Sequence, residues 1–136
     1  MTARFLADKS ALARMDTPAV ATRLGPLLTE GLVATCAVVD LEVLYSARSP
    51  ADYEALREER RAFPDVPVTP AVMERALQVQ RLLARKGRHR VPIPDLIIAA
   101  TAESAGLAVL HYDADYEHIA TATGQPHRWV VPRGTV

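Results

Sequence analysis

The sequence predicts an α/β fold built around a mainly parallel β-sheet. Short apolar runs alternate with helical stretches along the chain, which is the pattern of repeated strand–helix–strand units. Acidic residues follow two of these runs, at Asp8 and Asp113, and two others, Glu42 and Asp95, lie inside apolar helical stretches. These observations indicate both a fold class and the edge of the sheet where a site is expected.

The first third of the chain predicts two strands separated by helices. The apolar run RFLA at 4–7 is short enough for a strand, and helix-compatible sequence starts at Ser10. A second helix is expected over 17–31, because Pro18 suits the first turn of a helix. The run LVAT at 32–35 predicts the next strand.

The middle of the chain predicts two helices of different character. The stretch AVVDLEVLYSA at 37–47 is apolar enough for a largely buried helix. The stretch at 49–63 begins with Ser49 as a cap and Pro50 at the first helical position. Its charges are dense and its apolar residues sparse, so an exposed helix is expected.

The next segment predicts a short strand, VPVT at 66–69, followed by a long helix over 70–87 that stops at Gly87. Apolar residues recur in this helix at spacings of three and four, the period of one buried helical face. They are Val72, Ala76, Val79 and Leu83.

The last third predicts one more buried helix and two strands. The stretch IPDLIIAATAESAG at 93–106 is apolar and ends on glycine. LAVLHY at 107–112 is a strand candidate, a helix follows from about residue 114, and RWVV at 128–131 completes the pattern. No internal repeat is visible.

Composition favours one soluble domain spanning residues 1–136. The chain is 49% hydrophobic and 24% charged, with a formal net charge of zero. A nucleic-acid partner would therefore need a local basic patch. The single cysteine excludes an internal disulfide, no apolar segment approaches the roughly 18 residues of a membrane span, and MTARFLADKS is too short in apolar residues for a signal peptide. We expect a cytoplasmic protein.

Four acids are expected to converge on one edge of the sheet. Asp8 and Asp113 follow predicted parallel strands, whose carboxyl ends share an edge where ligands gather. Glu42 and Asp95 lie in apolar helices, where an unpaired carboxylate is costly. Ordinary roles are also open: Asp8 and Asp113 as helix caps, Asp95 at the positive end of its helix, and Glu42 paired with an arginine.

Carboxylates brought this close repel one another, so some must be protonated or a cation must neutralise them. Carboxylate oxygens suit a hard cation, Mg²⁺ or Mn²⁺. Zinc is disfavoured because one cysteine and four scattered histidines (89, 111, 118 and 127) form no usual ligand spacing.

Four stretches in this order resemble the PIN-domain ribonucleases, most closely the VapC toxins of bacterial toxin–antitoxin pairs. They are FLADKSALARM, LEVLYSAR, IPDLIIAATA and VLHYDADYEHIA, and together the resemblance covers essentially the whole chain. It implies a PIN-like three-layer sandwich, in which helices flank a central, mainly parallel sheet of four to five strands.

The resemblance also implies the site residues. Asp8, Glu42, Asp95 and Asp113 match the family's catalytic, metal-binding carboxylates. Auxiliary roles match two other residues. Ser10, in a small-hydroxyl position, would support the metal through Asp8 or a bound water, and Asp115 matches a second acid often present after the fourth. His111 is expected to point away from the site.

The implied function is that of the toxin of a type II toxin–antitoxin system. Family members are Mg²⁺- or Mn²⁺-dependent endoribonucleases that hydrolyse RNA by metal-activated water. They are typically homodimers and are neutralised by a small VapB-like antitoxin. Two alternatives remain at this point: a catalytically silent PIN-like domain that acts by binding a partner, and a receiver-like signalling domain.

Cations near the acids are candidates for RNA contacts. The densest basic run, RKGRHR at 85–90, supplies Arg85, Lys86, Arg88 and Arg90, and Arg14 lies just beyond Asp8. A solvated helix end explains the run equally well. Aromatic residues make up only 5% of the chain, so backbone contacts to unpaired RNA are expected to dominate. The antitoxin is expected to cover VATRLGPLL (20–28) or YEALREERRAF (53–63).

Overall fold

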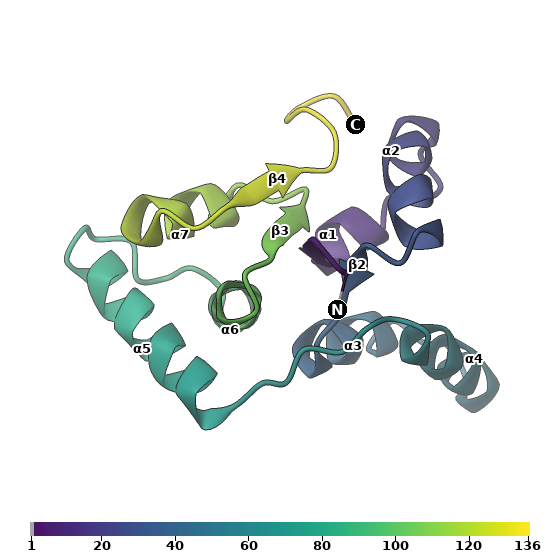
Figure 1. Ribbon diagram of the computed structural model, residues 1–136, viewed down its shortest axis with the longest axis horizontal. Helices are drawn as coiled ribbons and strands as arrows, with labels where there is room; N and C mark the ends of the chain where they lie inside the picture. Colours follow the sequence, from purple (N-terminus) through teal and green to yellow (C-terminus); the bar gives the residue numbers. More distant parts are fainter. Residues whose placement is uncertain (1) are drawn as a thin grey trace.

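A computed structural model describes residues 2–136 and has at its centre a four-stranded, wholly parallel sheet (Figure 1). The strand order is β2-β1-β3-β4, and all three pairs of neighbours are parallel. The strands are β1 (Phe5–Ala7), β2 (Val33–Ala34), β3 (Ala108–His111) and β4 (His127–Trp129). The predicted α/β class with a parallel sheet is confirmed.

Helices cover both faces of this sheet, with α5 and α6 on one side of the row of strands and α2 on the other (Figure 1). Their bounds are α1 (Lys9–Leu12), α2 (Pro18–Thr29), α3 (Ala37–Leu44), α4 (Pro50–Arg61), α5 (Pro70–Ala84), α6 (Ile93–Ser104) and α7 (Asp115–Thr123).

Alternation along the short strands divides the core into two clusters. Leu6 and Val109 point into the cluster that contains the buried faces of α3, α5, α6 and α7. Phe5, Ala7 and Leu110 point the other way, into the cluster with α1 and α2. Successive strand residues face opposite sides, so both faces of the sheet are apolar and both need a helical layer.

The predicted pattern on α5 is confirmed, because Val72, Ala76, Val79 and Leu83 are all buried. Ser49 also caps α4 as expected, since its hydroxyl accepts a hydrogen bond from the Asp52 N–H at 3.0 Å. Gly87 follows α5 with φ at 70°, a left-handed conformation that glycine adopts without a Cβ penalty.

The strand expected at 66–69 is wrong. The chain just before it makes one isolated parallel bridge, between Thr35 and Asp65, and the Val66 N–H donates to the Thr35 carbonyl at 2.8 Å. On one side of this bridge Pro64 has no N–H to donate to β2. On the other side the chain that follows β2 enters α3 at Ala37, so the pairing does not continue.

Two further expected elements are shorter than the sequence indicates. The helix expected from Ser10 is the single turn α1, and the helix expected to reach residue 47 ends at Leu44. Within residues 2–136, no helix is long and apolar enough to cross a membrane.

Candidate metal centre

Two acids leave the sheet at the same edge because their strands are neighbours. β1 and β3 are parallel with Ala7 opposite Leu110, and Asp8 follows β1 directly. The Asp8 N–H donates to the Leu110 carbonyl at 2.9 Å, which holds the two strand ends together. Asp113 comes two residues after the end of β3. The carboxyl ends of β1 and β3 therefore carry the first two carboxylates.

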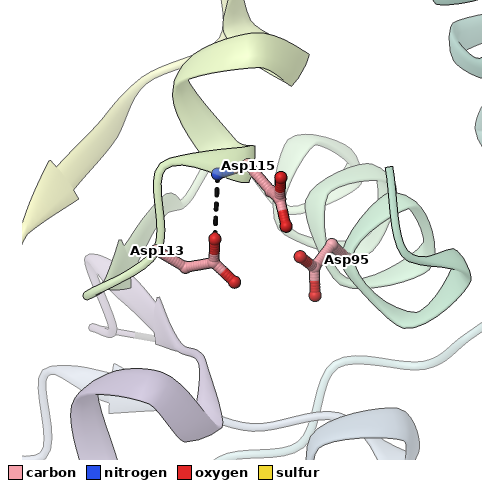
Figure 2. A group of neighbouring side chains, drawn as sticks. All are labelled: Asp95, Asp113 and Asp115. Atoms are coloured by element: carbon pink, nitrogen blue, oxygen red, sulfur yellow. Dashed lines mark hydrogen bonds between the residues drawn. The ribbon is translucent and has the colours of Figure 1, made fainter. Parts of the chain in front are cut away.

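Three carboxylates meet beside this edge: those of Asp95, Asp113 and Asp115. One oxygen from each lies within 4.8 Å of the others, and Figure 2 shows the three side chains pointing toward one another. Asp95 comes from the first turn of α6, and Asp115 begins α7. The Asp113 Oδ1 atom accepts a hydrogen bond from the Asp115 N–H at 2.9 Å. Asp115, expected to be auxiliary, thus belongs to the group of three acids whose oxygens lie within 4.8 Å of one another.

Asp95 is the most strongly perturbed acid of this group. Burial raises its pKa to about 8, and the negative charges of Asp8 and Asp113 add to the effect. Only 6% of the residue is exposed, and its Oδ2 atom has no hydrogen-bond partner among the described residues. An ionised carboxylate is costly in such a place unless a cation neutralises it.

Glu42 approaches the same region from α3, outside the 4.8 Å group. Burial raises its pKa, the charge of Asp8 adds to the effect, and the charge of Lys9 opposes it. Its Oε1 atom is buried and has no partner among the described residues. The arginine pairing considered for this residue is absent from the ion pairs of residues 2–136.

Asp8 differs from these acids because both of its oxygens accept hydrogen bonds. Its Oδ2 atom accepts from the Ser10 N–H at 3.0 Å, so Asp8 also caps α1, as the ordinary explanation predicts. Its Oδ1 atom accepts from the Tyr116 hydroxyl at 2.8 Å. Tyr116 was not among the predicted site residues. The signal for it in the sequence is an aromatic residue directly after Asp-x-Asp, at a position that α7 turns inward.

Ser10 contacts Asp8 through its main chain and uses its hydroxyl elsewhere. The Ser10 Oγ atom accepts a hydrogen bond from the Tyr112 N–H at 2.9 Å, which ties α1 to the end of β3. The hydroxyl therefore stabilises the loop that carries Asp113.

His111 lies beneath the centre and is fully buried. Its Nδ1 atom accepts a hydrogen bond from the Asp113 N–H at 3.1 Å, and its Nε2 atom lies 2.9 Å from the Nδ1 atom of His127. Burial lowers the pKa of His111 to about 4, and the neighbouring His127 contributes to the shift. The neutral ring therefore supports the backbone of Asp113.

The basic run lies between the end of α5 and α7. The Lys86 ammonium donates to the Thr121 carbonyl at 2.8 Å, and the Arg88 guanidinium lies 2.6 Å from the Nδ1 atom of His118. His118 is one helical turn from Asp115, so Arg88 is fixed against the helix that carries this acid. Arg85 and Arg90 are exposed.

Arg14 lies on another side of the centre. Its guanidinium donates to the Ser10 carbonyl at 2.7 Å and stacks over the ring of Tyr112, 4.6 Å from the ring centroid.

The donor set fits a hard divalent cation. All of its ligand atoms are carboxylate oxygens, and two buried oxygens, Glu42 Oε1 and Asp95 Oδ2, lack a partner among the described residues. A cation held by these carboxylates would neutralise their charge and reduce the repulsion that adds to the effect of burial on the pKa of Asp95.

Comparisons with known proteins agree on one family. The PIN domain family matches residues 10–122. Ribonuclease VapC21 of Mycobacterium tuberculosis is 51% identical over 137 residues, with 99% of each chain covered. Ribonuclease VapC51 of the same organism is 45% identical, covering 100% of this chain and 99% of that protein.

Solved structures show the same fold. A chain of DNA-bound VapBC from Salmonella typhimurium superposes with a TM-score of 0.75 at 18% identity, covering 95% of this chain and 99% of that one. VapBC-5 from Mycobacterium tuberculosis gives a TM-score of 0.62 at 27% identity, with 90% and 94% covered.

Proposed function

Because the chain belongs to the PIN-domain family and, within it, to the VapC ribonucleases, we propose that it is the toxin of a type II toxin–antitoxin system. It is a metal-dependent endoribonuclease. Residues 1–136 form a single PIN domain in this proposal, which is supported by the two core clusters sharing one sheet.

One observation carries the metal dependence: buried carboxylate oxygens converge without enough partners. Asp95, Asp113 and Asp115 would hold the cation, with Glu42 and Asp8 beside them. Oxygen-only ligands favour Mg²⁺ or Mn²⁺ over softer metals. The bound cation activates water at neutral pH and stabilises the negative charge that develops on the phosphate.

The chain's own residues orient the acids and the RNA. Asp8 is held by its two donors, and Asp113 is held by the N–H of Asp115 and by His111. His111 is neutral and engaged on both ring nitrogens, so it is not free to take a proton from the substrate. His111 therefore acts on the backbone of Asp113 and not as an acid or base.

The RNA backbone is held by the cations around the acids. Arg88 contacts His118, which lies one turn after Asp115 on α7, and Arg14 donates to the Ser10 carbonyl. Arg85, Lys86 and Arg90 extend the same positive region along the exposed run. Because unpaired strands expose their phosphates and bases to side chains, single-stranded or looped RNA is the expected substrate.

The partner is a small VapB-like antitoxin, and the structure favours one of the two candidate surfaces. In the 20–28 segment, Val20 and Leu24 are fully buried, and Leu27 and Leu28 pack against the core. That helix has little apolar surface left for a partner. The 53–63 segment instead lines a hollow of about 540 Å³ between α3 and α4.

The chemistry of this hollow indicates an amphipathic antitoxin segment. Leu41 and Tyr53 expose 66% and 41% of their surface there. Arg57 and Arg61 stand on its α4 side. An antitoxin helix with apolar residues against the floor and carboxylates against the arginines is complementary to it. Homodimer formation and a cytoplasmic location stay predictions.

Cleavage of RNA by the purified protein tests this function. RNA should be cut with Mg²⁺ or Mn²⁺ and left intact with EDTA, and Asp95→Asn should abolish cleavage without unfolding the protein. Asp16→Asn, at an exposed position, is the matched control and should cut normally. Absence of cleavage of any RNA with either metal, while an antitoxin still binds, would favour the catalytically silent alternative.

A further inference from the structure

The Tyr116 hydroxyl is a buried polar group with no role in the proposed function described above. Tyr116 is 2% exposed and lies in the first turn of α7. Its hydroxyl donates to the Asp8 Oδ1 atom at 2.8 Å, across 108 residues of sequence. A phenol needs a partner once it is buried, and here the partner is one of the candidate metal-binding carboxylates.

The ring of Tyr116 is held in place by the same residue that supports Asp113. Its centroid lies 4.9 Å from that of His111, which is fully buried and accepts the Asp113 N–H. The hydroxyl therefore projects from a fixed ring toward Asp8. Because His111 ends β3 and Asp8 follows β1, this contact locks two strand ends and α7 to one another.

Asp8 is consequently the most constrained of the acids. The Ser10 N–H binds one oxygen, and the Tyr116 hydroxyl binds the other. Glu42 and Asp95 each keep a buried oxygen without a partner among the described residues. A carboxylate that already has its bound orientation loses little rotamer freedom when a cation arrives, and each oxygen keeps a lone pair for it.

We propose that Tyr116 is a positioning residue, whose hydroxyl holds Asp8 in the orientation needed for metal binding. This inference rests on the proposed metal-dependent function. Groups that orient metal ligands in this way contribute roughly 10- to 100-fold to metal affinity or activity. A purely structural Tyr116 would need only its ring, because the packing against His111 does not involve the hydroxyl.

The test compares Mn²⁺ affinity between wild type and Tyr116→Phe, which keeps the ring and removes the hydroxyl. Free Mn²⁺ is measured by electron paramagnetic resonance during titration, so the readout does not depend on RNA cleavage. Tyr116→Phe should weaken Mn²⁺ binding by about tenfold or more. The Mg²⁺ concentration for half-maximal cleavage should rise in parallel, while KM for RNA stays unchanged.

Tyr112→Phe is the matched control. Its hydroxyl bonds only to the main chain of Gly134 and Val136 among the described residues, and to none of the five acids of the site. Tyr112→Phe should therefore keep wild-type Mn²⁺ affinity. Equal losses in both variants would indicate general loosening of the fold and would overturn the positioning role.

A double-mutant cycle shows whether Tyr116 acts through Asp8. In an Asp8→Asn background, adding Tyr116→Phe should change Mn²⁺ affinity by less than about twofold, because the effects of coupled residues are not additive. Should Tyr116→Phe be destabilised, affinity is taken from the Mn²⁺-induced shift of the unfolding midpoint, which reports binding to the folded state.

The outcomes separate this inference from the function on which it rests. If wild type binds no Mn²⁺, the metal-dependent function fails. If wild type binds Mn²⁺ and Tyr116→Phe binds it equally well, the function stands and the positioning role of Tyr116 is wrong.

Discussion

Asp95→Asn should stabilise the metal-free protein, and the gain should depend on pH. Asp95 is 6% exposed, and burial with the charges around it raises its pKa to about 8 from an ordinary value of 3.8. The folded protein therefore holds a proton between pH 4 and 8 that the unfolded chain releases. Wild-type stability falls as pH rises through this window, whereas asparagine does not titrate.

The size of the effect follows from the shift. One pKa unit corresponds to about 1.4 kcal/mol. The free energy of unfolding of Asp95→Asn minus that of wild type should therefore increase by about 1.4 kcal/mol per pH unit between pH 4 and 8. The gain is roughly 3 kcal/mol between pH 5.5 and 7.5. Below pH 4 the carboxyl is protonated in both states, and above pH 8 it is ionised in both, so the difference becomes constant.

Urea unfolding in EDTA at several pH values measures this difference, with Asp16→Asn as the exposed control. Adding Mn²⁺ should narrow the difference in stability at pH 7.5. A cation at a hundred times its Kd stabilises wild type by about 2.7 kcal/mol, and Asp95→Asn should gain much less because a ligand is missing.

A difference that does not change between pH 5.5 and 7.5 would refute the reasoning. It would mean that Asp95 is ionised without cost in the folded protein and that the neighbouring acids do not repel it. A wild type more stable than the variant throughout, in EDTA, would show that the ionised carboxylate has a partner in solution.

The remaining predictions concern Asp8, the α3–α4 pair and the RNA surface. Asp8→Asn should lower RNA cleavage ~100-fold or more in protein that urea titration shows to be folded, and full activity would remove Asp8 from the site. Arg60→Ala should lower the free energy of unfolding by about 3 kcal/mol, because the buried Asp40 loses its nearest cation at 2.9 Å. Urea unfolding measures this, and a small loss would show that Arg57, at 3.8 Å, and the Thr35 hydroxyl are sufficient partners for Asp40. Arg88→Ala should weaken RNA binding and reduce the slope of log affinity against log salt by about one, whereas an unchanged slope would limit Arg88 to its contact with His118.

Local patterns were sufficient for most of the fold. Strands that alternate with helices, and the buried stripe on α5, follow from periodicity that each segment carries by itself. The strand predicted at 66–69 is wrong although its apolar residues resemble a strand, because Pro64 has no N–H to donate and the chain after β2 enters α3 at Ala37, which leaves no partner beyond the single bridge of Asp65. The exposed character expected of α4 is correct for most of its length. Arg60 is the exception, since it is buried against Asp40 and Thr35.

The positions of some site acids can be predicted from the sequence, whereas the contacts between them cannot. Asp8 and Asp113 are predictable from sequence, because a residue that follows a parallel strand lies at a known edge of the sheet. Glu42 and Asp95 are noticeable as charges in apolar helices. By contrast, three features needed the tertiary structure. They are the inclusion of Asp115 in the 4.8 Å group, the Tyr116–Asp8 hydrogen bond and the support of Asp113 by His111.

The sequence by itself therefore determined the class of fold, the order of its elements and the supply of carboxylates, since each depends on residues close together in the chain. Tertiary structure decided which oxygens meet, which are already bonded and which are left for a cation. The physical reason is that these contacts join segments up to 108 residues apart. The distances between the carboxylates are set by the packing of α6 and α7 against the sheet, and this packing cannot be predicted from the periodicity of either segment.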